Sequence, residues 1–94
     1  MPDAAIPRHE PERGCFSVAV DGERAVIEYT VDGGVMTIHH TRVPKRIEGR
    51  GIAGALVRAA LDFARAQDLR VRPSCSYADA WMRRHPDYDA LRAS

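Results

Sequence analysis

A cluster of glycines at the start of a helical pattern is the part of this sequence best suited to chemistry. The segment Gly49-Arg50-Gly51-Ile52-Ala53-Gly54 follows a strand-like stretch at 35–44 and opens a helical pattern at 52–67. Backbone N–H groups in the first turn of a helix have no partner within the helix, and the helix dipole favours negative charge there. Glycine has no Cβ, so a phosphate can approach the backbone closely. The segment therefore predicts a site for a phosphorylated ligand.

Two further side chains near this segment carry groups that catalyse acyl transfer. His40 stands near the end of the strand, and its neutral imidazole accepts a proton near pH 7, so it is the candidate general base. Because His40 shares strand parity with Met36 and Ile38, a hydrogen-bonded core histidine is the alternative. Cys75 follows the next expected strand and precedes a helix, whose N-terminus lowers the pKa of a thiol. It is a candidate nucleophile or proton donor, and otherwise a small packed residue.

Length and composition predict one domain that does not bind nucleic acid. The 94 residues carry a formal net charge of +1 and are 45% hydrophobic. Two cysteines, Cys15 and Cys75, are too few for a disulfide framework and, with the four histidines, match no zinc pattern. The polar, proline-rich start is unlike a signal peptide, and no apolar run approaches the ~18 residues of a membrane span. We expect a reduced, cytoplasmic protein without a metal or membrane contact.

The pattern before the glycine segment predicts an antiparallel meander. Residues 1–13 contain three prolines and are expected to form a flexible arm. Strands are expected over 15–20, 24–31 and 35–42, joined by the turn signals Asp21-Gly22 and Asp32-Gly33-Gly34. The middle strand would present Ala25, Ile27, Tyr29 and Val31 on one face.

A crossover helix and a parallel strand are expected after the meander. The helix carries its apolar residues at helical spacing: Ile52, Leu56, Ala59, Ala60, Phe63 and Ala64. A strand at 69–73 would lie parallel to the 35–42 strand, because a helix is the usual crossover between parallel neighbours. A second helix is expected over 77–84, with Ser76 and Asp79 as a capping box, before a partly ordered tail at 87–94. The fold class is α/β (α+β), a β-meander followed by a β-α-β crossover and a C-terminal helix.

Two classes of phosphorylated ligand use such a glycine turn. The letters G-R-G-I-A-G satisfy the dinucleotide pattern G-x-G-x-x-G, but that pattern belongs to a parallel sheet and needs an acidic residue about 20 positions on. Here antiparallel strands come first, and Asp68 is too close. The other class is acyl-coenzyme A.

Four segments in order carry a resemblance to a known family. Glu48-x-x-Gly51-x-Ala53 looks like motif A of the GNAT superfamily of N-acetyltransferases, usually written Q/R-x-x-G-x-G/A. The other segments are His40-Thr41-x-Val43-Pro44, Pro73-x-Cys75-Ser76-Tyr77 and Arg83-Arg84-His85-Pro86-x-Tyr88. Together they resemble the small single-domain YjdJ-type branch over about residues 15–91. Residues 14–94 are therefore expected to be one GNAT-like acetyltransferase domain.

The resemblance implies an acetyl-CoA site and an acetyltransferase activity. In this family the loop and helix start bind the pyrophosphate of coenzyme A, and two neighbouring strands splay apart around the pantetheine arm. The cofactor-binding residues implied are Val43, Gly49, Arg50, Gly51, Ile52, Ala53, Gly54, Ala55 and Cys75, with Arg83 and Arg84 toward the 3′-phosphate. The expected reaction moves the acetyl group of acetyl-CoA to an amine on a small molecule or a protein, with His40 and Cys75 as catalytic residues.

Departures from the family pattern leave other functions open. Glu48 replaces Gln or Arg and, when ionised, donates no hydrogen bond to phosphate; it could instead act as a base through water or pair with Arg46 or Arg50. The stretch 81–84 lacks the tyrosine that protonates the leaving thiolate in larger members, and Tyr77 either donates a hydrogen bond in the site or packs on the sheet. A non-catalytic coenzyme A binding module acting with a partner, or a domain completed by a second copy, is the alternative.

Overall fold

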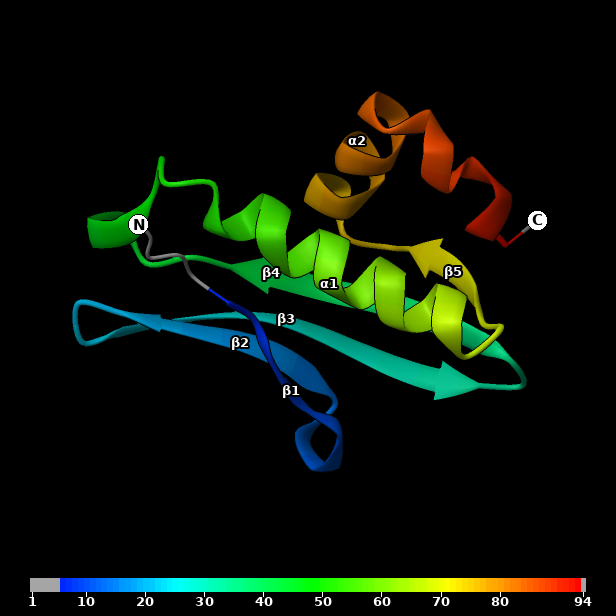
Figure 1. Cartoon of the computed structure of the whole chain (residues 1–94), viewed down its shortest axis with the longest axis horizontal. Coiled ribbons are helices and arrows are strands. Elements are labelled where there is room, and N and C mark those ends of the chain that lie inside the picture. The colour runs from blue at the N-terminus through cyan, green and yellow to red at the C-terminus, as the bar shows by residue number, and fades with distance from the viewer. Residues whose placement is uncertain (1–5, 94) are drawn as a thin grey trace.

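Five strands lie side by side in chain order and form one sheet (Figure 1). The structure is a computed structural model, in which residues 6–93 are described. The strands are β1 (Arg8–Glu10), β2 (Cys15–Val20), β3 (Glu23–Asp32), β4 (Val35–Arg42) and β5 (Arg70–Pro73). The first four pair antiparallel, and β5 runs parallel to β4 after the crossover helix α1 (Ile52–Ala66); α2 (Ser76–Arg84) follows. The expected meander, crossover and C-terminal helix are confirmed.

Helix α1 packs along one face of the sheet, which we call the inner face, and leaves the opposite, outer face uncovered by any helix of residues 6–93 (Figure 1). The fully buried residues of this layer are Leu56, Val57, Ala60, Leu61 and Ala64 of α1 and Ala25, Ile27, Met36, Ile38 and Val71 of the sheet. Burying each large aliphatic side chain stabilises the fold by roughly 1.5–3 kcal/mol. The core therefore lies between α1 and the inner face.

The N-terminal segment differs from its prediction. Arg8–Glu10 is strand β1 and pairs with β2, so the flexible arm expected over 1–13 is wrong for residues 8–13; residues 1–5 lie outside the described part. The cause is His9, whose ring stacks on Phe16 at 4.2 Å and whose Nε2 lies 2.5 Å from the Tyr29 hydroxyl. This aromatic contact lies on the inner face and holds the edge strand to the core.

The C-terminal segment is also more regular than predicted. Residues Pro86–Leu91 form a 3₁₀ helix, η3, and the backbone N–H of Ala93 donates to the Val71 carbonyl at 2.8 Å. The Tyr88 hydroxyl donates to Asp62 of α1 at 2.7 Å, and Tyr88 is buried. The expected capping box is wrong, because α2 begins one residue earlier, with Cys75 as its N-cap and no side-chain cap.

The helices in residues 6–93 include none with the length and apolar character that a membrane span requires.

A β-bulge interrupts the ladder between β3 and β4. Tyr29 pairs with Ile38 and Glu28 pairs with His40, so His39 is an extra residue on β4. Beyond it, Thr41 pairs with the inner-face residue Ile27. An extra residue reverses the alternation of side chains, so Thr41 takes the inner position and His40 moves to the outer face. The expectation that His40 shares a face with Met36 and Ile38 is therefore wrong.

The face predicted for β3 is right for three of its four residues. Ala25, Ile27 and Tyr29 are buried, but Val31 is 47% exposed. Val31 lies beside Gln67 and Leu69 in an apolar hollow where α1 has already ended. The helix is too short to cover the far end of the strand.

Candidate active site

The glycine segment forms an open turn at the entrance of α1. Gly49 and Gly51 have φ angles of 81° and 77°, and a Cβ at either position would meet no atom within 4 Å. Gly51 is the N-cap of α1 and carries no side chain to cap the helix. In residues 6–93, backbone bonding to the first turn begins with Ala55, whose N–H donates to the Gly51 carbonyl. The donors of 49–54 and the helix dipole therefore favour an anion at this turn.

Two ion pairs hold the loop before α1 onto the turn between β2 and β3. The Arg50 guanidinium lies 2.8 Å from the Asp21 carboxylate, and the Arg46 guanidinium lies 3.1 Å from the Glu23 carboxylate. The predicted pairing of Glu48 with either arginine is therefore wrong. Because two separate turns are joined, the glycine turn has a fixed position relative to the sheet.

Helix α2 approaches the first turn of α1 closely at Gly54. A Cβ there would lie 3.2 Å from Nε1 of Trp81 and 3.7 Å from the Tyr77 hydroxyl. Glycine thus allows an indole N–H and a phenol to lie against the anion turn. Tyr77, 36% exposed, lies at α1 rather than packing on the sheet.

The strands β4 and β5 separate beside this turn. Strand β5 ends at Pro73, which pairs with Ile38, whereas β4 continues to Arg42. The last backbone contact between the two segments is from Cys75 N–H to the Ile38 carbonyl, 3.1 Å. Residues 39–42 of β4 therefore have no partner on β5, and we call this gap in the ladder, between them and the start of α2, the opening. Val43, packed against the core, follows it.

The thiol of Cys75 lies at this opening. In its protonated form it donates to the Thr41 hydroxyl, with Sγ and Oγ1 3.4 Å apart. Burial raises the pKa of Cys75, but hydrogen bonds from the Thr41 hydroxyl and from backbone N–H groups of Ala78, Tyr77 and Thr41 outweigh burial and hold the pKa below the 9.0 of an ordinary thiol. The arrangement favours a thiolate at the N-terminus of α2. The other cysteine, Cys15, is only 4% exposed and lies on β2, so it is a packed residue away from this opening.

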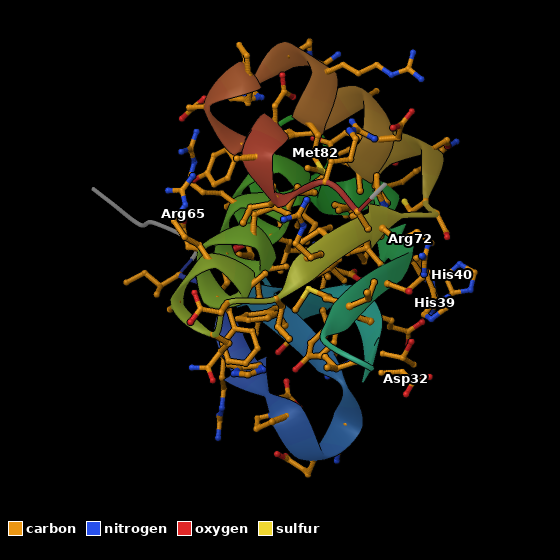
Figure 2. The ribbon with its side chains drawn as sticks, turned by 90° about the vertical axis from the view of Figure 1, so that its right-hand side faces the viewer. Asp32, His39, His40, Arg65, Arg72 and Met82 are labelled. Carbon is orange, nitrogen blue, oxygen red and sulfur yellow. The ribbon has the colours of Figure 1, made fainter. Side chains whose placement is uncertain are left out.

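Both histidines of the bulge project from the outer face, near Arg72 of β5 (Figure 2). His39 Nε2 lies 2.9 Å from the Thr30 hydroxyl, and His40 stands opposite Glu28. His40 is exposed, so the structural role of a core histidine is excluded. The thiol and the imidazole of the two catalytic candidates thus flank the same opening from opposite faces of the sheet.

The two arginines predicted to meet the 3′-phosphate differ in their surroundings. Arg83 lies 3.0 Å from Asp79, which also binds Arg92 of the C-terminal segment at 2.8 Å. Arg84 is exposed and follows Trp81 by three residues, so it shares the helix face that meets Gly54. Arg84 thus shares the α2 face of Trp81, whereas Arg83 is engaged by Asp79.

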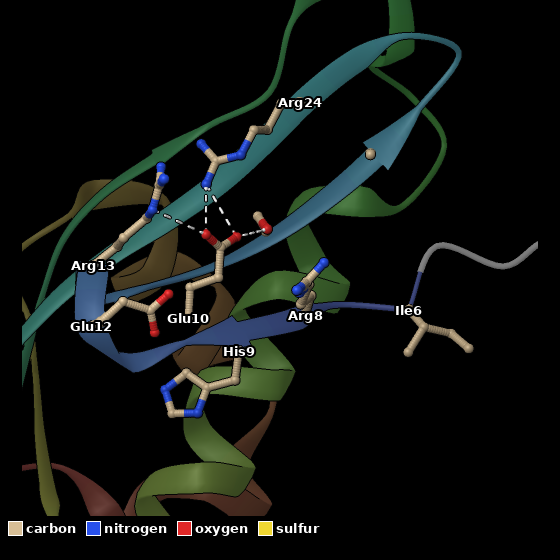
Figure 3. Close-up of a pocket in the computed structure, with 9 residues that line it drawn as sticks. Ile6, Arg8, His9, Glu10, Glu12, Arg13 and Arg24 are labelled. Atoms are coloured by element: carbon tan, nitrogen blue, oxygen red, sulfur yellow. Dashed lines mark hydrogen bonds and ion pairs between the residues drawn. The ribbon is translucent and has the colours of Figure 1, made fainter.

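A separate hollow of about 720 Å³ lies at the opposite edge of the sheet (Figure 3). Its carboxylate, Glu10, accepts a hydrogen bond from Ser17 and lies 3.1 Å from Arg24 and 3.6 Å from Arg13. The Ser17 hydrogen bond is the largest of the effects that hold the pKa of Glu10 low. This cluster is internally paired and ties β1 to its neighbours.

Fold and site together form a compact α+β architecture in which two strands separate beside a glycine turn at a helix entrance. The model of the GCN5-related N-acetyl-transferase family matches residues 15–91, and the chain belongs to that family. Protein NATD1 of Mus musculus is 38% identical over 81 residues, covering 83% of this chain and 74% of its own length. Protein NATD1 of Homo sapiens is 35% identical over 98 residues, covering 88% and 87%.

A solved structure agrees with this assignment. The NMR solution structure of a GCN5-like protein from Staphylococcus aureus superimposes with a TM-score of 0.73 at 25% identity, covering 94% of this chain and 87% of that one. The GNAT-like fold expected from motif A is confirmed.

Sequence reasoning did not single out Thr41 or Asp21 as parts of the site. Thr41 reaches the inner face only because of the bulge, and the residue types in β4 do not predict a bulge. Asp21 meets Arg50 across 29 positions of sequence, with a positive φ of 52°. The residues Asp21-Gly22 predicted a turn, but they did not predict that this turn contacts the loop before α1.

Proposed function

We propose that this chain is an acetyl-CoA-dependent N-acetyltransferase in which the turn at 49–54 holds the pyrophosphate. The observation that carries the proposal is the thiol of Cys75, surrounded by hydrogen-bond donors at the point where β4 and β5 separate. Family membership supports the chemistry, and the unobstructed glycines support the cofactor.

The residues present fit coenzyme A. Gly49 and Gly51 adopt a conformation that L side chains rarely take, and the space a Cβ would occupy is open. The backbone donors of 49–54 and the Trp81 indole N–H lie at the entrance end of α1, where a diphosphate gains several hydrogen bonds. Arg84, on the same face of α2 as Trp81, adds a guanidinium for the phosphates of the cofactor. When bound, acetyl-CoA supplies the acetyl group as a thioester.

Cys75 acts as nucleophile in the proposed mechanism. Its thiolate attacks the carbonyl carbon, a bond from Sγ to the acetyl carbon forms, the thioester bond breaks, and the displaced thiolate of coenzyme A takes a proton from solvent. His40 then accepts a proton from the ammonium of the acceptor, whose free amine attacks the S-acetyl carbon. The new C–N bond forms, the bond to Sγ breaks, and the nitrogen releases its second proton to solvent to give the amide. Cys75 returns to the thiolate that Thr41 and the α2 amides stabilise.

Mass spectrometry of the intact protein tests the nucleophile. After rapid mixing with acetyl-CoA alone, we expect one added acetyl group, mapped to Cys75 and absent from Cys75→Ser. Cys15→Ala is the matched control and should retain the modification, because Cys15 lies on β2, away from the opening. An unmodified wild-type mass at the shortest quench times contradicts the covalent step.

Amine-dependent release of free thiol from acetyl-CoA tests the activity as a whole. We expect release that requires both the amine and His40. Calorimetry that gives a heat of binding for coenzyme A, without turnover across a broad amine panel, would instead identify a binding module that acts with a partner. Absence of both heat and thermal protection by coenzyme A contradicts the cofactor assignment.

A further inference from the structure

Two arginines beside the bulge make no contact that neutralises them. Arg42 follows His40 by two residues on the outer face, and Arg72 projects from β5 opposite Thr37. Within residues 6–93, neither guanidinium has a carboxylate within 4.0 Å or donates a side-chain hydrogen bond. Six other arginines pair with carboxylates (Arg13, Arg24, Arg46, Arg50, Arg83 and Arg92), and Arg58, Arg65 and Arg70 donate to a hydroxyl or a carbonyl. Within residues 6–93, Arg8 on the far edge strand and Arg84 on α2 share this lack of a partner, but neither lies on β4 or β5.

The two sides of the bulge differ in charge. On the β3 side, Glu28 stands opposite His40 and is half-buried. On the β5 side stands Arg72, which Figure 2 shows projecting toward the same region as the histidines. Asp32, the other carboxylate of this face of β3, lies four positions from Glu28, opposite Val35. Glu28 and Arg72 therefore lie on opposite sides of β4 on the outer face, Glu28 opposite His40 and Arg72 opposite Thr37.

We propose that the outer face at the bulge selects amines that also carry a carboxylate, with the amine at Glu28 and His40 and the carboxylate on Arg72. This inference rests on the acetyltransferase function proposed above and adds its acceptor class. A guanidinium binds a carboxylate through two parallel N–H donors, so it discriminates strongly between a carboxylate and a neutral amide. A polycationic acceptor is disfavoured, because Arg42 and Arg72 both repel it.

Matched acceptors test the selection. Glycine is compared with glycinamide, and β-alanine with β-alaninamide, with kcat/KM expressed per unprotonated amine. We expect each acid to exceed its amide by about 10-fold or more, a difference that arises in KM and falls to about 2-fold or less in Arg72→Gln. Arg8→Gln is the control, because Arg8 is an exposed arginine at the far edge of the sheet. Its acid-to-amide ratio should equal that of the wild type.

A binding measurement separates this inference from the proposed function. The acetylated products of β-alanine and its amide are titrated while the imidazole resonances of His39 and His40 are followed by NMR. We expect saturable shifts with the acid, weakened about 10-fold in Arg72→Gln, at an unchanged affinity for coenzyme A. If amides are acetylated as well as acids, the selection is wrong while the acetyltransferase stands. If no amine is acetylated but the acid still binds, the acetyltransferase is wrong while the carboxylate site stands. Equal binding of both products overturns the site.

Discussion

Side chains along β3 and β4 point alternately to the inner and to the outer face of the sheet, and the two faces differ in role. Inner residues such as Ile27 and Ile38 are fully buried under α1, whereas His39 and His40 are exposed on the outer face. At the bulge the alternation of inner and outer side chains along β4 is reversed. As a result Thr41 points inward to Cys75 and His40 points outward. One extra residue therefore places a candidate catalytic group on each face of the sheet, while the residues before it keep their buried positions under α1.

Truncation of the inner face should have the largest effect. Ile38→Ala removes a fully buried side chain under α1, and we expect a loss of about 2–5 kcal/mol in the free energy of unfolding. His39→Ala, one position along, should change it by about 0.5 kcal/mol or less, since His39 is exposed. Urea denaturation measures both. Similar losses for the two variants contradict the division between faces.

Removal of the outer imidazole should affect turnover rather than stability. We expect His40→Gln to reduce kcat/KM for amines about 10²-fold, since a positioned general base contributes roughly 10²–10⁴-fold. Acetylation of Cys75 by acetyl-CoA alone should be unaffected, because it does not require the amine to lose a proton. If His40→Gln slowed the acetylation of Cys75 and the transfer of the acetyl group to the amine equally, His40 would act in the acetylation of Cys75 as well.

Loss of the Thr41 hydroxyl should raise the pKa of Cys75. In Thr41→Val one of the hydrogen bonds that outweigh burial is removed, so the pH profile of thiol alkylation moves to higher pH. The sign for stability follows from the same shift. The folded pKa lies below the unfolded one, so the thiolate stabilises the fold fully above pH 9.0, and this contribution is lost as the pH falls through the folded pKa. An alkylation profile identical to that of the wild type would exclude Thr41 from the thiol site.

Release of the glycine turn from the β2–β3 turn should have the smallest effect. Asp21→Asn removes the charge that pairs with Arg50, and since both side chains are about half exposed the pair is worth roughly 1 kcal/mol or less. We expect calorimetry to show a Kd for coenzyme A raised about 2- to 5-fold. Asp32→Asn, at the end of β3 next to the other hairpin turn, is the matched control and should leave the Kd unchanged.

Much of this architecture was predictable because it depends on neighbours in sequence. Alternation in 24–31, the glycine turns and the helical spacing of 52–64 predicted the meander, the crossover and the position of the glycine turn before α1 to within one or two residues. The errors arose where contacts between residues far apart in the sequence determine the local structure. His9 becomes part of β1 because Phe16 and Tyr29 lie beneath it, and Val31 is exposed because α1 ends before reaching it.

The sequence by itself determined the order of strands β2 to β5, the glycine turn at the entrance of α1 and the family to which the chain belongs, since local periodicity and spacing encode these. Tertiary structure alone decided which face His40 occupies, what surrounds the Cys75 thiol and which arginines remain without a carboxylate. The physical reason is that register, and with it the bulge, is set by pairing between β3 and β4. A shift of one residue there exchanges the two faces while the pattern of residue types along the chain stays the same.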